Sequence, residues 1–303
     1  MPKTYIIIVT YNGMPWLKKC LDSCAAYAVI IVDNASTDIT VSFIETNYPD
    51  VTIFRQADNL GFGQANNIGI RYALDQGAEH VFLLNQDAYL VDSVLDELVV
   101  FQKQHSNYGV LSPIHITGDQ KKLDNNFSNF MLKEKTGQFY SDFVLGNNLA
   151  AVYEVPFINA AAWLISRKCL ETVGGFDPLF FHYGEDENYC QRVVFHDLKI
   201  GVLPQCYVIH DREYRQKNKS RMFSKAYYNM AEISYKIKLA NILLPFTIKK
   251  SIRIVERGVF KMFIQLRIKK AYGFSKEFIL LKSICKDIEE SRKRNLSKGS
   301  HYL

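Results

Sequence analysis

Short apolar runs alternate with amphipathic segments along the first third of the chain. The apolar runs have the length of strands and are rich in β-branched residues, which is typical of strands buried on both faces. They cover residues 4–10, 28–32, 51–55, 80–84 and 108–112. The amphipathic segments between them predict helices over residues 14–25, 37–47, 64–76 and 92–104. This alternation predicts an α/β fold with an open, mostly parallel sheet and helices on both faces.

The pattern weakens after residue 112. Residues 113–155 are rich in Asn, Asp, Lys and Gly, and we interpret them as a variable loop region. Two further strands are predicted over residues 157–166 and 200–209. Ser36 is the predicted N-cap of the second helix, and the Gly-rich stretch 59–63 predicts a turn ahead of the third helix.

A helical pattern dominates the chain from about residue 219 onward. Apolar residues recur with a period of 3.6 over residues 221–243 and 246–270, and less regularly over 276–291. Pro245 separates the first two of these predicted helices, and each has a Lys/Arg-rich face opposite its apolar face. The last dozen residues are polar, and we expect them to be frayed.

The charge of the chain is divided unequally. The net charge of +6 hides a C-terminal part, residues 211–303, with 23 basic and 8 acidic residues and a net charge of +15. Residues 1–210 carry a net charge of −9. The change near residue 211 therefore marks the domain division that composition favours.

The cysteines and the apolar runs indicate a cellular compartment. The six cysteines form no CxxC pair and no metal-finger spacing, which favours a reduced, cytosolic compartment. The opening apolar run over residues 4–10 lacks the charged leader and the cleavage site of a signal peptide. No stretch reaches the roughly 18 uninterrupted apolar residues that span a bilayer. We therefore expect a cytoplasmic protein.

Polar residues follow several of the predicted strands. Asp33 ends the second strand, where a carboxylate can accept hydrogen bonds from a nucleotide; a helix cap is the alternative. Asp87 follows the fourth strand, where a carboxylate and phosphate oxygens can hold Mg²⁺ or Mn²⁺; an Asx turn is the alternative. His210 follows the last strand and can offer an imidazole nitrogen, although a lone histidine is more often structural.

An acidic cluster stands inside the segment GGFDPLFFHYGEDENYCQR, residues 174–192. Glu185, Asp186 and Glu187 follow an aromatic loop and open a short predicted helix. One of these acids can act as a base if its surroundings raise its proton affinity. The alternative is an ordinary acidic helix N-terminus that interacts with the helix dipole.

In their order along the chain, these motifs resemble the nucleotide-sugar-dependent glycosyltransferases of family two, which have the GT-A fold. The matching motifs are IIIVTYNG at 6–13, VIIVDNASTD at 29–38, NLGFGQANNIGI at 59–70, LLNQDA at 83–88, WLISR at 163–167, the segment 174–192 and IH at 209–210. The resemblance covers roughly residues 4–215 and is closest to the rhamnosyltransferase-like branch of bacterial polysaccharide assembly. It implies a GT-A catalytic domain over residues 1–215, with a nucleotide-sugar half at 1–112 and an acceptor half at 113–215. A basic helical extension over residues 216–303 follows.

The family pattern also implies residues that contact the donor. Thr10 and Asn12 would lie beside the nucleotide, Asp33 would contact the nucleobase, and Asn66 would line the sugar-nucleotide pocket. Asn85 replaces the first acid of the family's DxD motif. An amide can hydrogen-bond a ribose or a phosphate-bound water, but it carries no negative charge.

The same pattern implies a divalent metal. Asp87 matches the last acid of the DxD motif, and His210 matches a histidine that can complete the metal shell. Because Asn85 brings no charge, we expect Mg²⁺ or Mn²⁺ to bind more weakly, or to rely on Asp87 and His210.

The implied reaction is a single displacement that inverts the anomeric carbon. Asp186 matches the aspartate that removes the proton of the acceptor hydroxyl. Glu185 would position Asp186 or bind an acceptor hydroxyl. Trp163 and Tyr183 offer faces on which a sugar ring can rest; for Trp163 a place in the core is the alternative.

The resemblance and the basic extension imply partners. The donor would be a UDP-, dTDP- or GDP-sugar, and the acceptor a saccharide or a lipid-linked acceptor. Amphipathic basic helices suit the inner face of an anionic membrane, or form a solvated appendage, and they can also serve a homodimer. We expect no nucleic-acid partner, because the extension lacks an RNA-recognition signature.

Other functional classes fit less well. A nucleotidyltransferase usually begins with a Gly-rich loop containing Arg and Lys, which residues 4–20 lack. Only the basic extension favours the alternative of a non-catalytic binding protein. Only Asn85 favours the alternative of a transferase scaffold that has lost its activity.

Overall fold

The computed structural model describes residues 3–133, 136–212 and 221–303. The chain divides into two compact units, Met1–Glu213 together with Lys298–Leu303, and Tyr214–Ser297. The domain boundary predicted between residues 215 and 216 lies outside the described residues.

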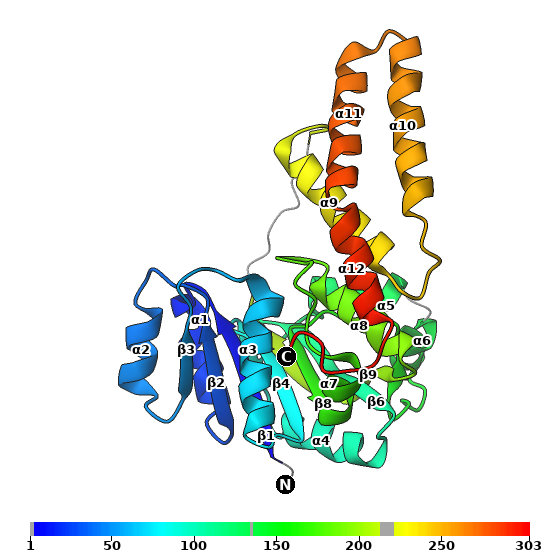
Figure 1. The fold of residues 1–303 in the computed structure, drawn as a ribbon. Helices are drawn as coiled ribbons and strands as arrows, with labels where there is room; N and C mark the ends of the chain where they lie inside the picture. The colour runs from blue at the N-terminus through cyan, green and yellow to red at the C-terminus, as the bar shows by residue number, and fades with distance from the viewer. Residues whose placement is uncertain (1–2, 134–135, 213–220) are drawn as a thin grey trace. The chain divides into compact units, whose positions relative to one another are not determined.

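The first unit is built on a central sheet (Figure 1). Its strands are β1 Thr4–Thr10, β2 Ala28–Asp33, β3 Thr52–Arg55, β4 His80–Asn85, β5 Ala88–Leu90, β6 Tyr108–Thr117, β7 Tyr153–Glu154, β8 Ala162–Ser166 and β9 Lys199–His210. Among the described residues they form a nine-stranded sheet in the order β3-β2-β1-β4-β8-β6-β9-β5, with β7 pairing β9. Strands β1 to β4 are parallel neighbours, as predicted.

The other half of the sheet is mixed, so the expectation of a mostly parallel sheet is wrong there. β8 runs antiparallel to both β4 and β6, and β5 and β7 run antiparallel to β9; β6 and β9 are parallel. An apolar run marks a buried strand, but it does not encode the strand's direction. Antiparallel neighbours also need no helical crossover, so the alternation of strands and helices gives no warning of them.

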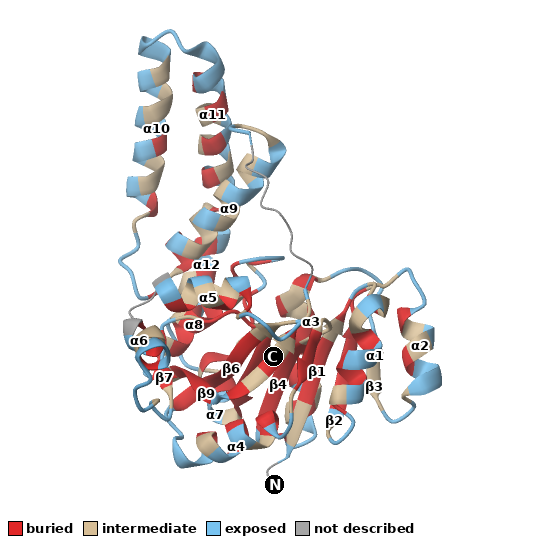
Figure 2. Ribbon diagram, turned by 180° about the vertical axis from the view of Figure 1, so that it is seen from behind, coloured by how far each residue is buried: buried red, intermediate tan, exposed pale blue. Residues whose placement is uncertain are grey.

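Two helical layers cover the sheet. The helices of the first unit are α1 Met14–Ser23, α2 Thr40–Asn47, α3 Gly61–Asp75, α4 Val94–Gln104, α5 Asn125–Lys133, α6 Gly137–Leu145, α7 Arg167–Val173 and α8 Glu185–Phe195. Helices α1, α2 and α4 bury apolar residues on one face of the sheet, and α3, α5, α6, α7 and α8 on the other. β1 serves both cores, since Ile6 and Ile8 point to one face and Ile7 to the other. Figure 2 shows the resulting buried strands between the layers.

Several local predictions differ from the structure. Ser36 does not cap α2, which begins at Thr40 without a side-chain cap. The Gly-rich stretch is not a separate turn, because α3 already begins at Gly61. Residues 113–155 are more than a loop: they include the end of β6, helices α5 and α6, and β7. Their high content of Asn, Asp and Gly hides short helices that long-range packing stabilises.

The C-terminal residues are ordered, so the expected fraying is wrong for residues 298–303. Gly299 N donates to Thr172 O at 3.0 Å, and Gly175 N donates to the carbonyl of His301 at 2.8 Å. The Tyr302 hydroxyl donates to Asp177 at 2.9 Å, and Leu303 packs against the core of the first unit. We call residues 298–303 the C-terminal strap.

The second unit is helical. Its helices are α9 Lys225–Ala240, α10 Ile248–Ile264, α11 Ile268–Ser283 and α12 Cys285–Asn295, where the sequence predicted three segments. The buried Glu277 accepts hydrogen bonds from the hydroxyls of Tyr227 and Tyr235, which join α9 to α11. α10 and α11 lie side by side as a hairpin (Figures 1 and 2). In the part of the chain that the structure describes, no helix is both long enough and apolar enough to cross a bilayer.

Candidate active site

A cavity of about 390 Å³ opens at the carboxyl ends of β1, β2 and β4. Ligands of open α/β sheets bind at this edge. It is lined by Val9, Tyr11, Asn34, Asn59, Gly61, Phe62, Asn85, Gln86, Asp87, Phe181 and His182. Five motifs that the sequence singled out therefore meet around one space, although they are spread over more than 170 residues of chain.

The start of α3 forms one wall of this cavity, and Asn34 fixes it in place. Asn34 Nδ2 donates to Asn59 Oδ1 at 2.9 Å, and Leu60 N donates to Asn34 Oδ1 at 2.8 Å. Gly61 has a φ of +79°, and a Cβ there would lie 1.9 Å from the carbonyl oxygen of Phe181. Only glycine allows this backbone and the loop before α8 to approach so closely.

Gln86 joins the ends of β1 and β4 at the cavity wall. Tyr11 N donates to Gln86 Oε1 at 2.9 Å, and Gln86 Nε2 donates back to Tyr11 O at 3.2 Å. Neither Gln86 nor Asn34 was expected to line the cavity. Both are amides directly after or near a strand end, which is the signal that could have identified them.

Four residues that the family pattern places at the donor do not line the cavity. The buried Asp33 accepts hydrogen bonds from the Thr10 hydroxyl at 3.0 Å and from the Ser36 amide at 3.0 Å. Asn12 Oδ1 accepts from the amide of Thr37 at 2.8 Å. The buried Asn66 donates to Phe62 O, one helical turn back, at 2.9 Å. In this structure Thr10, Asn12 and Asp33 hold together the loops that follow β1 and β2, and Asn66 bonds within the first turns of α3.

Asp87 and His210 lie next to each other, as the sequence predicts for a shared site. β5 and β9 pair Ala88 with His210, and Asp211 N donates to Asp87 O at 2.8 Å. His210 Nε2 lies 3.4 Å from Asp87 Oδ1, and its Nδ1 lies 3.5 Å from Asp124 Oδ2. Although burial opposes the charge of the imidazole, Asp124 and Asp87 raise the pKa of His210 to about 9.

Asp124 is a contact of His210 that the sequence analysis missed. It precedes α5, and its Oδ1 accepts from Asn126 N and Phe127 N at 2.9 Å, the pattern of a helix N-cap. Against the effect of burial, its contact with His210 and the Phe127 amide lower the pKa of Asp124 to about 2. Because residues 113–155 were interpreted as a variable loop, no predicted helix start singled out Asp124.

The pair Asp87 and His210 fits a divalent cation with few protein ligands. The structure, where it is described, contains no group of three or more His, Cys, Asp or Glu side chains arranged around a metal position. Mg²⁺ needs only one or two carboxylates when substrate phosphates complete its shell. A ligating histidine usually turns its other ring nitrogen to a carboxylate, and His210 Nδ1, which is buried without a hydrogen bond, faces Asp124 in this way.

The acidic cluster forms the first turn of α8. Burial raises the pKa of Asp186 to about 6, although backbone hydrogen bonds from Glu187 and Ala160 oppose this. Burial and the neighbouring Asp186 raise the pKa of Glu185 to about 8. Glu185 Oε2 is buried without a hydrogen-bond partner. Asp186 follows the cavity residue His182 by four positions.

Trp163 and Tyr183, which were expected to hold a sugar, do not line the cavity. Trp163 is fully buried in the core against Phe176 and Tyr189, so the expectation that its face receives a sugar is wrong. β8 is covered on both faces, which leaves no open side for the indole. Tyr183 is exposed with a φ of +67° and does not line the cavity.

The segment that leads to Asp186 is anchored by buried polar side chains that the sequence analysis did not identify. Asn67 Oδ1 accepts from Phe176 N at 2.7 Å, and its Nδ2 donates to Phe176 O at 2.8 Å. The buried guanidinium of Arg192 donates to Val173 O at 2.9 Å and to Gly175 O at 2.7 Å. Residues 173–176 therefore have a fixed course between α3 and α8.

Known proteins resemble this chain in sequence. The glycosyl transferase family 2 model matches residues 5–174. Agl10 of Haloferax volcanii, a low-salt glycan biosynthesis hexosyltransferase, is 25% identical over 73% of this chain and 70% of its own. RfbF of Shigella flexneri, a dTDP-rhamnosyl transferase, is 25% identical over 68% of each chain. An N-acetylglucosaminyl-diphospho-decaprenol L-rhamnosyltransferase of Mycobacterium tuberculosis is 24% identical over 68% of this chain and 75% of its own.

Solved structures resemble the fold. S. aureus TarS, crystallised with UDP-GlcNAc, has a TM-score of 0.56 at 15% identity and covers 97% of this chain and 89% of its own. The mannosyltransferase PcManGT of Pyrobaculum calidifontis, crystallised with GDP-Man and Mn²⁺, has a TM-score of 0.52 at 18% identity and covers 94% and 75%. The expected GT-A architecture is confirmed. The family match spans more than half of the chain, and the chain is therefore a glycosyltransferase that belongs to glycosyl transferase family 2.

Proposed function

We propose that this enzyme transfers a rhamnose-like sugar, with inversion, from a nucleoside-diphosphate donor to an acceptor hydroxyl during the synthesis of a surface polysaccharide. One observation carries the proposal: Asp87 and the loop residue His182 line the same cavity. Asp186 follows His182 by four positions. The segment of Asp186, whose pKa is raised, therefore meets the segment of Asp87 at one cavity. Asp87 in turn lies beside His210.

Asp186 is the proposed base. With a pKa near 6, it is ionised at neutral pH and still has a higher proton affinity than an ordinary aspartate. It takes the proton of the acceptor hydroxyl while the oxygen bonds to the anomeric carbon. The bond from that carbon to the diphosphate breaks in the same step, and the nucleoside diphosphate leaves with the electron pair. Glu185 is protonated at neutral pH and serves as a positioning residue.

Asp87 and His210 are the proposed metal ligands, with Asn85 on the same strand end. A bound Mg²⁺ or Mn²⁺ would supply the positive charge that stabilises a leaving diphosphate. Asp124 keeps the His210 ring in place, because its carboxylate faces Nδ1 and leaves Nε2 directed at Asp87. Thr10, Asn12 and Asp33 hold the loops after β1 and β2 that border the proposed nucleotide pocket, and Asn66 stabilises the first turns of α3 beside it.

The relatives suggest the partners. The name of RfbF contains a dTDP-rhamnosyl donor, and that of the mycobacterial relative contains a diphospho-decaprenol acceptor. We propose a dTDP-6-deoxyhexose as donor, ahead of UDP- and GDP-sugars, and a lipid-linked saccharide as acceptor. Such an acceptor places the reaction at the cytoplasmic face of a membrane, and a peripheral membrane contact is part of the proposal.

A donor screen tests the function. Hydrolysis and thermal-shift assays with UDP-, dTDP- and GDP-sugars, with and without Mn²⁺ or Mg²⁺, should single out one nucleotide and depend on the cation. Asp186→Asn keeps the side-chain shape and should lower transfer about 100-fold or more while donor binding persists. The matched control is Glu187→Gln on the same turn, which should retain activity. Full activity of Asp186→Asn would reject the assignment of the base.

A further inference from the structure

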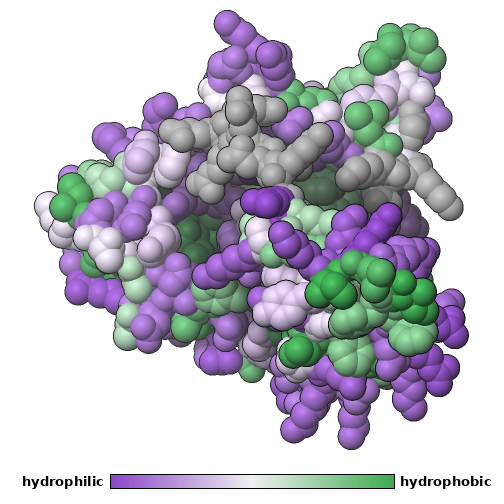
Figure 3. Space-filling model, turned by 90° about the horizontal axis from the view of Figure 1, so that it is seen from above, coloured by the Kyte–Doolittle hydropathy of each residue, from purple (hydrophilic) through white to green (hydrophobic). Residues whose placement is uncertain are grey.

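The tip of the α10–α11 hairpin exposes large apolar side chains to solvent. Leu266 is 83% exposed, Ile264 is 68% exposed and Phe260 is 66% exposed. Phe263, Ile268 and Tyr272 are exposed nearby. Six such residues lie within a span of thirteen, 260–272. Figure 3, which looks down on the molecule, shows a hydrophobic patch ringed by hydrophilic side chains. A contiguous exposed apolar patch marks an interaction site.

Cations surround this apolar tip. Residues 249–270 contain eight basic residues and the single acid Glu256, a net charge of +7. The basic residues are Lys249, Lys250, Arg253, Arg257, Lys261, Arg267, Lys269 and Lys270. All eight are exposed, and within the described parts of the chain none of them forms an ion pair. Their charge is therefore available to an external anionic partner.

Helix α10 presents apolar and basic residues on one outward face. Ile248 and Val255 are buried and define its inward face. At about 100° per residue, the side chains of Lys249, Arg253, Arg257, Phe260 and Ile264 share the opposite face. This outward face is basic over its first three turns and apolar near the tip.

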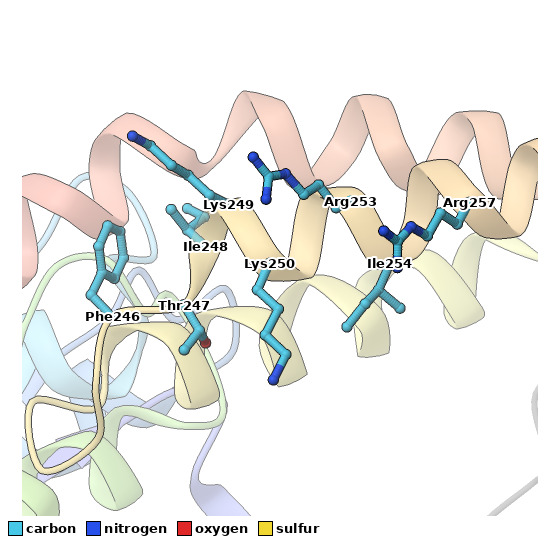
Figure 4. Close-up of a pocket in the computed structure, with 8 residues that line it drawn as sticks. All are labelled: Phe246, Thr247, Ile248, Lys249, Lys250, Arg253, Ile254 and Arg257. Atoms are coloured by element: carbon cyan, nitrogen blue, oxygen red, sulfur yellow. The ribbon is translucent and has the colours of Figure 1, made fainter.

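A groove accompanies the basic part of this face. It has a volume of about 600 Å³ and combines the cations Lys249, Lys250, Arg253 and Arg257 with apolar side chains, among them Phe246 and Ile254. Figure 4 shows that the four cations project from the same helix as Ile254. Such a lining suits an amphiphile with a phosphate and a hydrocarbon portion.

The chemistry favours one class of partner. A second copy of the hairpin would bring two strongly basic surfaces together, and a nucleic acid would leave the apolar tip unused. An anionic phospholipid surface satisfies both parts, because the phosphates attract the cations and the headgroup–acyl boundary takes up the apolar side chains. The catalytic part, residues 1–210, carries a net charge of −9, so the attraction to such a surface comes from the basic C-terminal part, to which the hairpin contributes.

We propose that the α10–α11 hairpin docks the enzyme peripherally on an anionic phospholipid bilayer. Phe260, Ile264 and Leu266 enter the headgroup region, and Lys249, Arg253 and Arg257 bind lipid phosphates. The inference rests on the proposed function only for its purpose, which is to bring the active site to a lipid-linked acceptor. The binding itself needs neither donor nor acceptor.

Flotation of the full chain with vesicles tests the docking surface. The chain should bind vesicles of phosphatidylcholine and phosphatidylglycerol, bind much less to phosphatidylcholine alone, and dissociate as salt is raised. The triple variant Lys249→Gln/Arg253→Gln/Arg257→Gln should bind about 100-fold more weakly, at about fivefold for each cation. The variant Phe260→Ser/Ile264→Ser/Leu266→Ser should lose about 10-fold or more.

The catalytic unit provides matched controls. Lys103→Gln/Lys121→Gln/Lys168→Gln removes the same charge from exposed positions, and Val100→Ser/Leu132→Ser removes exposed apolar side chains. Both controls should bind vesicles as the unchanged chain does. All the substituted hairpin residues are exposed, so these variants should fold, and circular dichroism checks this.

The following outcomes would overturn the proposal. Equal binding to both kinds of vesicle, or unchanged binding of both hairpin variants, contradicts it. A dimer that the tip variant abolishes, without vesicle binding, identifies a second copy as the partner; salt-sensitive DNA binding without vesicle binding identifies nucleic acid. Donor hydrolysis is measured separately without vesicles. If the chain hydrolyses no donor but still floats with vesicles, the proposed function is contradicted and the proposed membrane docking is still supported.

Discussion

Glu185 and Asp186 are adjacent carboxyl groups whose environments separate their pKa values. Burial raises the pKa of both, and the charge of Asp186 raises that of Glu185 further, to about 8 against about 6. Between these values one group is ionised and the other is protonated. Two neighbouring acids can thus serve as a base and a neutral hydrogen-bond donor, a division that environment alone establishes.

The pH dependence of transfer should show this division. Because Asp186 must be ionised to act, the rate should fall tenfold per pH unit below about pH 6 and level off above it. Glu185→Gln mimics the protonated state, so the acid limb should stay near pH 6. The measurement is the initial rate at saturating donor from pH 4.5 to 8. An acid limb that moves to the pH of an ordinary carboxyl in Glu185→Gln would show that Glu185 takes part in the titration.

The raised pKa of Asp186 also predicts a cost in stability. The unfolded chain releases this proton near pH 4 and the folded chain near pH 6, so stability falls as pH rises between the two values. Asp186→Asn should therefore raise the free energy of unfolding by about 1–3 kcal/mol at pH 7, and by much less at pH 4. Urea unfolding at both pH values measures this. The exposed Asp58→Asn is the control and should change neither value.

The position of the cavity at the strand ends could be predicted from the sequence. The direction of individual strands and several side-chain contacts could not. Continuous apolar runs identified β1, β2 and β4, and the polar residues after them gave the place of the cavity. The orientation of β8 and the place of Trp163 depend on partners far away in sequence. The contact of Asp124 with His210 could not be predicted for a related reason, because it forms only when folding places the end of β9 beside Asp124.

At the level of elements, Gly61 couples the start of α3 to the loop before α8. Gly61→Ala should destabilise the chain and lower transfer, because a Cβ would force the Phe181 backbone away from the cavity. Gly77 is the matched control: its φ is +80°, but a Cβ there would have no atom within 4 Å. Both variants carry the backbone cost of about 1–2 kcal/mol, whereas only Gly61→Ala should weaken donor binding. Equal donor affinity in the two variants would contradict the coupling.

On the scale of the whole molecule, the chain returns to its catalytic unit after the helical one. The C-terminal strap contributes the carbonyl of His301 to Gly175 N and the hydroxyl of Tyr302 to Asp177. A Cβ at Gly174 would lie 2.3 Å from His301 O, so the strap runs directly against Gly174, Gly175 and Phe176, which we call the GGF turn. The polar composition of residues 298–303 predicted fraying. The prediction failed because composition does not reveal the hydrogen bonds that a short segment makes to a distant part of the chain.

The strap should therefore support the catalytic loop. Deleting residues 298–303 removes the bonds at Gly175, Asp177 and Thr172 and the packing of Leu303, at roughly 1 kcal/mol for each hydrogen bond. The first unit should lose about 2–4 kcal/mol of stability, and transfer should fall more than donor binding, because the freed loop leads to Asp186. Tyr302→Phe removes one bond and should lose about 1 kcal/mol. Vesicle flotation, which depends on α10 and α11, should survive both changes. If deletion left stability and transfer unchanged, the strap would be a passive contact and the course of the GGF turn would be set by Asn67 and Arg192 alone.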